Sequence, residues 1–224
     1  TYYHYVDTTY HYGDDYTYHP TAYTWTGETW IATTYHPVDY TYHYTDYSDG
    51  DGVVDETIKI QVALTIDDSD IIVDFNGSHS QTIGGMNCPL AVTYSSVQFA
   101  IKAAADPWNP ANSGCYRPVT VVAPEGSVVN PIMPASVVAG NHETAMIIVS
   151  AMFGALSKAA PERCIAAGAD SSVVTVIGGM DDREERLGRK YVYLEVQGSS
   201  WGARHNGDGV NAKRAGVGNT GNQP

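Results

Sequence analysis

The chain has 224 residues, of which 43% are hydrophobic and 17% are charged, and its formal net charge is −13. This length is enough for one large or two small domains with a buried core. The acidic balance argues against binding to nucleic-acid phosphates, which needs clustered Lys and Arg. The longest apolar run, at 145–156, is too short to span a bilayer. The first residues, TYYHYVDTTY, lack the basic and apolar regions of a secretory signal.

Residues 1–49 differ in composition from the rest of the chain. They hold 13 of the 17 tyrosines and five of the eight histidines, and they contain no Lys, Arg or Leu. Thr and Tyr favour a pleated surface, so we expect an extended β segment here and a separate unit over 50–224. Three interpretations stay open: an added β-layer, a low-complexity arm, or a tract whose recorded residue types are not those of the natural chain.

The same tract contains a group of potential metal ligands, because His and carboxylate oxygen bind divalent transition metals. No spacing among them forms an HExxH or comparable helical pair, so the group is compositional and a genuine site is the less favoured interpretation. Its members are His4, His11, His19, His36, His43, Asp7, Asp14 and Asp15.

The pattern becomes regular after residue 50. The run TIKIQVALTI alternates apolar and polar residues, DDSD forms a turn and IIVDF returns, so we predict an antiparallel hairpin over 57–75. Its apolar side, which comprises Ile58, Ile60, Val62, Leu64 and Ile66, is expected to face a helix at about 142–159. The glycine-rich stretch that follows, up to Leu90, reads as a shaped surface loop.

Two helices and three further strands complete the expected elements. One helix is predicted from Ser95 to Ala105, capped by Ser95 or Ser96, and the long apolar helix ends before Pro161. The segments PVTVVAP, SSVVTVI and KYVYLEV read as strands, and the charged run at 181–190 reads as a solvated hairpin tip. The order lacks a regular βαβ alternation, which predicts an α+β fold with a mixed or antiparallel sheet packed against two main helices.

Three cysteines bear on the cellular compartment. Cys88, Cys115 and Cys164 are odd in number, widely spaced and outside any CxxC pair. Reduced thiols that pack as small hydrophobes explain this better than a disulfide framework or a zinc site. We therefore expect a cytoplasmic protein.

Several ordered motifs resemble the hydantoinase B/oxoprolinase family over about residues 40–224. In chain order they are DG, VDFNGSHSQTIGGMN, DPWNPANSGCYRPVTVVAPEGSVVNPIMPA, GNHETA, ALSKAAPERCIAAG and GSSWGARHNGDGVN. The first forty residues do not share the resemblance, and upstream family motifs of the type GDxxxxNDPxxGGTHLPD are absent.

The resemblance implies the B-type subunit of an ATP-dependent amidohydrolase that opens lactam-like rings such as hydantoins and 5-oxoproline. It equally allows a subunit of an ATP-dependent ketone carboxylase, and a non-catalytic assembly module with the family's fold stays open. The resemblance also implies that a hydantoinase A-type partner binds ATP, and the chain agrees with this in having neither a GxxxxGK[ST] nor a GxGxxG motif. We also expect a small-molecule substrate, an oligomer and, as one option, a divalent metal such as Zn or Mn.

Two polar clusters are the candidates for catalysis. GNHET puts Asn141, His142 and Glu143 at the start of the long helix, where free N–H groups favour an anion. GARHNGDG puts His205 and Asp208 in a glycine-flanked loop, as expected of an acid/base or metal-binding histidine. Ordinary capping, with Asn141 as the cap, and an exposed turn are the structural alternatives.

The glycine-rich loop supplies further candidates for substrate binding. Asn76, His79 and Asn87 lie in it, and Asn141 joins them from the helix start. A structural role is the alternative for each. No nucleophile is predicted, since neither GSHSQ nor QGSSWGA is a GxSxG elbow.

Overall fold

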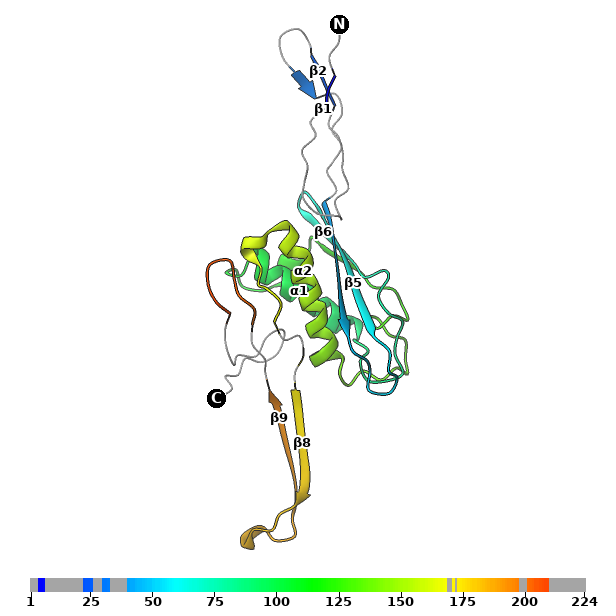
Figure 1. The fold of residues 1–224 in the computed structure, drawn as a ribbon, viewed down its shortest axis with the longest axis vertical. Coiled ribbons are helices and arrows are strands. Elements are labelled where there is room, and N and C mark those ends of the chain that lie inside the picture. Colours follow the sequence, from blue (N-terminus) through cyan, green and yellow to red (C-terminus); the bar gives the residue numbers. More distant parts are fainter. Residues whose placement is uncertain are drawn as a thin grey trace.

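The computed structural model describes residues 40–168, 171, 173–197 and 201–209, together with three short strands nearer the N-terminus. Those strands, β1 (His4–Val6), β2 (Ala22–Trp25) and β3 (Trp30–Ala32), pair with one another as an antiparallel sheet. The predicted α+β class is confirmed, because a mixed sheet packs against two main helices (Figure 1). Of the potential metal ligands in the tyrosine-rich tract, only His43 has a described side chain, and it is exposed.

The main sheet has four strands in the order β4-β5-β6-β7. Strand β4 (Tyr40–Ser48) is antiparallel to β5 (Ile58–Asp67), β5 is antiparallel to β6 (Asp70–Asp74), and β6 is parallel to β7 (Val119–Val122). The hairpin predicted over 57–75 is therefore confirmed. The tyrosine- and threonine-rich strand β4 is a full partner of β5 along its length.

The core lies between this sheet and two helices, α1 (Leu90–Ala105) and α2 (Ala145–Ala159), which cover one of its faces (Figure 1). Helix α2 packs on β4 and β5, and α1 packs on α2 and β7. The expected apolar side of β5 is confirmed, because four of its side chains are buried and Ile66 packs partly buried against the same core. Alternation with period two thus fixes which side of β5 faces the helices.

The predicted start of α1 at Ser95 was wrong. The helix begins at Leu90, directly after the extended residue Pro89, and it has no side-chain cap. The Ser95 and Ser96 hydroxyls instead donate to the carbonyls four residues earlier, Ala91 and Val92. Serine makes this bond inside helices as well as capping them, so the sequence alone did not distinguish the two positions.

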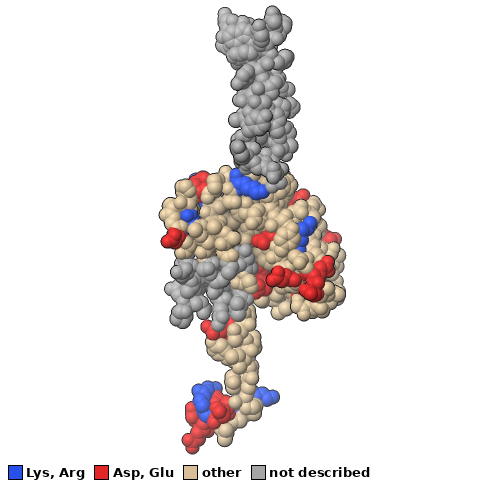
Figure 2. Space-filling view, in the orientation of Figure 1, with Lys and Arg blue, Asp and Glu red and all other residues tan. Residues whose placement is uncertain are grey.

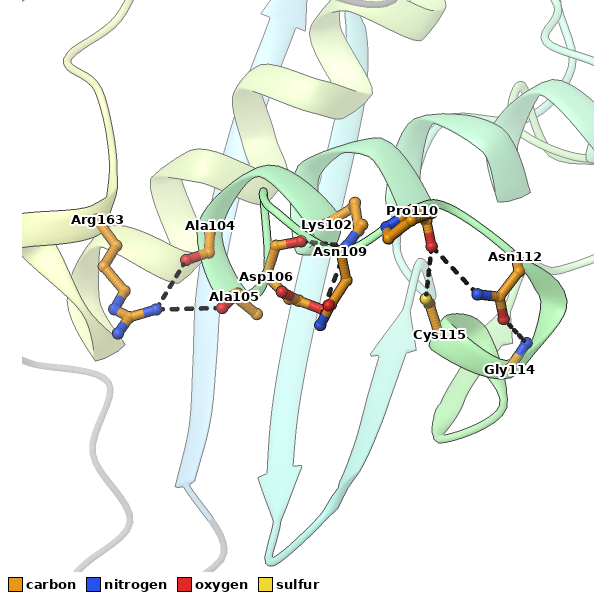
Figure 3. Close-up of polar contacts among 10 residues, drawn as sticks. All are labelled: Lys102, Ala104, Ala105, Asp106, Asn109, Pro110, Asn112, Gly114, Cys115 and Arg163. Carbon is orange, nitrogen blue, oxygen red and sulfur yellow. Dashed lines mark hydrogen bonds and ion pairs between the residues drawn. The ribbon is translucent and has the colours of Figure 1, made fainter.

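The end of α1 is held by two cations. Arg163, in the short 3₁₀ turn Pro161–Arg163, donates from Nη1 to the Ala104 carbonyl at 3.4 Å and to the Ala105 carbonyl at 3.1 Å (Figure 3). Lys102 forms an ion pair with Asp106 at 3.2 Å. Positive charge at a helix C-terminus offsets its unpaired carbonyls, so this end of the helix is closed without glycine.

The proline-rich loop after α1 is ordered by its own polar groups. Asn112 accepts from the Gly114 N–H at 2.8 Å and donates to the Pro110 carbonyl at 3.1 Å, and the Cys115 thiol bonds to the same carbonyl (Figure 3). These bonds set up the 3₁₀ turn Ser113–Tyr116 just before β7. The proline-rich segment between α1 and β7 is thus a structured connection.

A second sheet projects from the body as an arm. It consists of β8 (Val173–Met180) and β9 (Lys190–Gln197), paired antiparallel, with a short 3₁₀ turn (Glu184–Arg186) near its tip. Figure 2 shows a shaft with little charge that ends in a tip of mixed charge. The two predicted strands and the charged hairpin tip are confirmed. In the part of the chain that the structure describes, no helix is long and apolar enough to cross a membrane.

Packing of the tyrosine-rich strand on α2 gives a test of the fold. Alanine in place of a helical glycine ordinarily stabilises a helix by about 1 kcal/mol. A Cβ on Gly154, however, would lie 2.5 Å from the Tyr44 ring. Overpacking of this kind costs roughly 1–3 kcal/mol, so we expect Gly154→Ala to lower the free energy of unfolding in urea. In a Tyr44→Ala background the same change should be neutral or stabilising; stabilisation in both backgrounds would show that β4 does not pack there.

The cysteines give a second test. Cys88 and Cys164 are buried, and burial raises the pKa of each thiol from 9.0 to about 11. Cys115 is only partly buried. Because the thiolate is the reactive form, two pKa units slow alkylation by roughly 100-fold. We expect iodoacetamide at pH 8 to modify Cys115 first by mass spectrometry, with Cys88 and Cys164 reacting only after unfolding. Equal rates at Cys88 and Cys115 in the native state would contradict the buried core position.

Candidate functional site

The segment GNHET begins the long apolar helix as a turn of π-helix, Gly140–Thr144, which runs directly into α2. The expected cap at Asn141 was wrong: the residue before the π turn is Ala139, which offers no side-chain cap, and Asn141 is exposed. π turns are rare and occur frequently at functional sites. This one widens the helix at the position where His142 and Glu143 emerge.

His142 and Glu143 form a histidine–carboxylate pair. Nδ1 of His142 lies 3.0 Å from Oε1 of Glu143, and both side chains are largely shielded from solvent. A carboxylate only accepts, so the bond places the imidazole proton on Nδ1 and leaves the Nε2 lone pair available. Among the described residues, none bonds to Nε2. This tautomer is the one that a general base requires.

Ser171 adds a second contact to the same carboxylate. Its hydroxyl donates to Oε2 of Glu143 at 2.7 Å. Glu143 therefore joins a histidine from the helix start to a serine that is 28 positions later in the chain. The order Ser–Glu–His differs from a Ser–His–acid triad, because the carboxylate and not the imidazole lies in the middle. The serine thus orients the carboxylate, and no signal in the sequence connected it with GNHET.

The π turn rests on the glycine-rich loop. A Cβ on Gly140 would lie 2.1 Å from the Asn87 carbonyl oxygen, so only glycine permits this approach. The Ala139 N–H donates to the Gly85 carbonyl at 2.8 Å, and the Thr144 hydroxyl donates to the Met86 carbonyl. Two motifs that lie far apart in the sequence, IGGMN and GNHET, therefore meet backbone to backbone.

Asn87 holds this loop in shape. Its side chain is fully buried, and its amide group donates to the carbonyls of Thr82 at 2.9 Å, Gly84 at 3.2 Å and Ser136 at 2.8 Å. Its carbonyl oxygen accepts from the Thr82 N–H at 2.7 Å. The carboxamide is therefore occupied by the backbone, and its contribution to any bound ligand is indirect.

Asp51 braces the other side of the loop, and the sequence analysis did not select it as a site residue. Its carboxylate accepts from the backbone N–H groups of Val53 at 2.9 Å, Val54 at 2.7 Å and Gly84 at 2.6 Å. These bonds hold the pKa of Asp51 below its ordinary value of 3.8. A Cβ on Gly84 would lie 2.6 Å from the Asp51 carboxylate. The carboxylate can therefore approach this backbone only because residue 84 is glycine. The sequence signal that could have identified Asp51 is its place directly before a glycine, Gly52.

The remaining residues predicted in the glycine-rich loop lie elsewhere on it. Asn76 is exposed, and its N–H and side-chain amide both donate to Asp74. His79 lies 3.3 Å from Glu56 through Nε2, and its Nδ1 lies 2.7 Å from the Ser80 carbonyl. Asp51, Glu56 and His79 line a cavity of about 220 Å³ together with Gln81 and Thr82. His79 and Asp51 therefore line one cavity, and neither His142 nor Glu143 lines it.

His205 lies in a tight turn in which Arg204 and Gly207 exchange both backbone hydrogen bonds, and Asp208 follows directly after that turn. Both side chains are exposed. The turn packs on the 164–167 segment, because a Cβ on Gly202 would lie 2.0 Å from the Ala166 carbonyl oxygen. His205 also lines a cavity of about 300 Å³ that runs along α2, whose lining residues extend from Met146 to Ser157. His142, Glu143 and Asp208 do not line that cavity, so the two expected pairs do not share it.

The described residues offer no cluster of three or more His, Cys, Asp or Glu side chains that could hold a metal ion. The option of Zn or Mn therefore has no ligand set in this part of the chain.

Comparison with known proteins gives the family context. The model of the hydantoinase B/oxoprolinase family matches residues 28–224. An uncharacterised protein of Methanocaldococcus jannaschii is 38% identical over 148 residues, which are 66% of this chain and 25% of that protein. The B-type subunit of a candidate D-/L-hydantoinase from Pseudomonas sp. NS671 is 29% identical over 185 residues, or 80% of this chain and 30% of that protein. The chain thus spans about a quarter to a third of the length of these relatives.

Two solved structures share the fold. The ATP-dependent caprolactamase of Pseudomonas jessenii matches with a TM-score of 0.67 and 25% identity over 79% of this chain and 30% of its own. Acetone carboxylase matches with a TM-score of 0.65 and 16% identity, over 81% of this chain and 26% of its own. The α+β arrangement of the described residues is therefore a recurring architecture.

The central role of Asn87 can be tested by an isosteric change. Asn87→Asp replaces a donating amide with an oxygen that faces three carbonyls, and we expect a loss of about 3–5 kcal/mol in the free energy of unfolding. Asn141→Asp is the matched control: the residue is exposed, and a carboxylate near a helix start is favourable. The free energies of unfolding of both variants are measured by urea denaturation. Similar values for the two would contradict the role of the buried Asn87 side chain in holding the loop.

Proposed function

Because the chain belongs to the hydantoinase B/oxoprolinase family, we propose that it is part of the B-type subunit of an ATP-dependent amidohydrolase that opens lactam-like cyclic amides. The names of its relatives support this substrate class, since one is a candidate hydantoinase and a solved neighbour is a caprolactamase. The sequence has no phosphate-binding loop of its own, so ATP is assigned to a hydantoinase A-type partner. The working unit is then a hetero-oligomer in the cytoplasm.

The observation that carries the assignment of roles is the bond between Nδ1 of His142 and Oε1 of Glu143. In the proposed reaction, Nε2 of His142 takes a proton from the attacking water and later returns one to the leaving nitrogen. Glu143 stabilises the imidazolium that forms, and Ser171 keeps the carboxylate aligned. An anion at the helix start is not part of this proposal, because the N–H groups of Gly140, His142 and Glu143 already donate to the carbonyls of Val137 and Ala139.

His205 and Asp208 are proposed as a second acid/base pair. The position of His205 on the cavity along α2 supports contact with a substrate that enters there. Asn141, exposed beside His142, is proposed to hold polar groups of the substrate, as are Asn76 and His79 on their own loop. Asn87 contributes by fixing the backbone on which the π turn rests.

Two other functions are distinguished by specific observations. The fold shared with acetone carboxylase favours an ATP-dependent ketone carboxylase as the second candidate. The exposed aliphatic side chains of β8 and β9 favour a non-catalytic assembly module as the third. A carboxylase would consume bicarbonate with ATP and a ketone, whereas a module would neither turn over substrate nor lose function on substitution of His142.

The proposed roles predict the effect of three substitutions in the complex with its ATP-binding partner. His142→Ala should lower turnover of a cyclic amide such as hydantoin or 5-oxoproline by roughly 10²- to 10⁴-fold, and Glu143→Gln should lower it less, because the histidine remains. His205→Ala is expected to fall in the same range as His142→Ala. Turnover is followed by release of ADP and of the ring-opened product.

The matched control is His43→Ala, which removes an exposed histidine of β4. It should retain full turnover, and all variants should bind the partner as the unchanged chain does. Full activity of His142→Ala would remove His142 from the reaction while leaving the family membership intact. Bicarbonate-dependent ADP release with a ketone, and none with a cyclic amide, would favour the carboxylase.

A further inference from the structure

The cavity along α2 is built from two walls. One wall is a single stripe of α2, because its lining residues recur at the three- and four-residue spacing of one helix face. The other wall comes from the 164–168 segment and the turn at 201–205, and Tyr44 of β4 lies against the stripe at Gly154. The stripe comprises Met146, Val149, Ser150, Phe153, Gly154 and Ser157.

The size and lining of this cavity suit a small ring compound. Its volume of about 300 Å³ lies at the lower end of the range of roughly 300–1,000 Å³ that is typical of small-molecule sites. Phe153, Ile165 and Trp201 offer apolar surface to a hydrocarbon ring. Ser150 and His205 add a hydroxyl and an imidazole, groups that both donate and accept hydrogen bonds. An amide presents one donor and one acceptor, so this combination matches a cyclic amide.

Among the residues that the structure describes, no Lys, Arg, Asp or Glu lines the cavity. The cations that are close to it in sequence are engaged elsewhere. Lys158 donates to the His43 carbonyl at 2.7 Å, and Arg163 donates to carbonyls at the end of α1. The Arg204 guanidinium lies by its own turn, where a Cβ on Gly207 would be 3.6 Å from Nη2. A carboxylate in this cavity would therefore lack a positive partner on the described walls.

An acidic residue beside the wall acts in the same direction. Cys164 lines the cavity, and burial first and the charge of Glu162 second raise the pKa of its thiol to about 11. The thiol is therefore neutral, and the nearby negative charge disfavours an anion. Transfer of an unpaired carboxylate from water into such a site costs far more than transfer of an uncharged amide that finds hydrogen-bond partners.

We propose that this cavity binds an uncharged cyclic amide with an apolar ring or substituent, and that it selects against cyclic amides that carry a carboxylate, such as 5-oxoproline. The inference rests on the proposed function and narrows its substrate class. The hydrocarbon part of the ring contacts Phe153 and Trp201, and the amide lies toward Ser150 and His205. Selectivity follows from the absence of a cation on the described walls, so the carboxylate loses its hydration without gaining an ion pair.

The test compares two ligands that share one lactam ring. 5-Oxoproline and 5-methyl-2-pyrrolidinone differ in having a carboxylate or a methyl group on the same ring carbon. Binding to the natural polypeptide that contains this chain is measured without ATP by ligand-observed NMR titration. We expect the dissociation constant of the methyl compound to be lower by about 10- to 100-fold, the effect of one unpaired polar group. Similar constants, tighter binding of 5-oxoproline, or no binding of either ligand would overturn the inference.

Substitutions at Ser157 tie the binding to this cavity. Its hydroxyl donates to the Gly154 carbonyl within the helix at 2.8 Å. Ser157→Phe fills the space and should weaken binding of the methyl compound about 10-fold. Ser157→Lys supplies a cation in the last turn of α2, where positive charge suits the helix end, and should shift the preference toward 5-oxoproline.

Ser95 provides the matched controls. It is exposed on α1, and its hydroxyl makes the same kind of bond, to the Ala91 carbonyl. Ser95→Phe and Ser95→Lys should bind both ligands as the unchanged chain does, and circular dichroism should show all four variants folded. Affinity unaffected by Ser157→Phe, or a preference unaffected by Ser157→Lys, would count against the cavity as the binding site.

The binding test and the turnover test fail separately. Turnover of 5-oxoproline with ATP, by a complex in which the methyl compound does not bind, would overturn this inference and leave the amidohydrolase proposal in place. Selective binding of the methyl compound at this cavity, without ATP-dependent turnover of any cyclic amide, would support the site and contradict the proposed reaction.

Discussion

The buried carboxamide of Asn87 is the interaction on which the candidate site depends. It satisfies three carbonyls and one N–H that would otherwise be buried without partners, and such groups cost roughly 1–3 kcal/mol each when unpaired. Because its partners come from the glycine-rich loop and from Ser136, one side chain fixes two separate stretches of backbone. Because Gly140 packs closely on the Asn87 carbonyl, the π turn is held against the same fixed backbone.

The chemistry of the site follows from that rigidity. A histidine acts as a base at a defined position only if its ring orientation and tautomer are fixed. Glu143 fixes the tautomer of His142, Ser171 fixes the carboxylate, and the backbone beneath them is held by the loop. The π turn matters in the same way, because an extra residue in the helix changes the direction in which His142 and Glu143 project. Asp51 plays the corresponding role for Gly84 with three backbone bonds.

Sequence patterns predicted the elements whose structure is determined locally. The alternation in TIKIQVALTI gave the strand and its buried side, DDSD gave the hairpin, and Pro161 marked the end of the long helix. The start of α1 could not be predicted in this way. Thr93 is buried, and its hydroxyl donates to the Val129 carbonyl at 2.7 Å, so a contact 36 positions away stabilises the first turn. The local preference of serine for caps was outweighed by that packing. The candidate site was likewise predictable only where its signal is local. His142 and Glu143 could be found in the sequence as a polar pair in an apolar context. Ser171 and Asp51 could not, because Ser171 bonds to Glu143, 28 positions away, and Asp51 bonds to Gly84, 33 positions away.

Strand β4 shows how composition and structure diverge. Tyr42 and Tyr44 lie opposite aliphatic residues of β5, and Tyr42 is buried while Tyr44 packs against the core. Aromatic rings this large need space on the facing helix, and α2 supplies it with Gly154 opposite Tyr44. Lys158, one turn later, donates to the His43 carbonyl at 2.7 Å and holds the same strand by its backbone. The helix therefore complements an aromatic strand specifically, and the change in composition near residue 50 falls inside one continuous sheet.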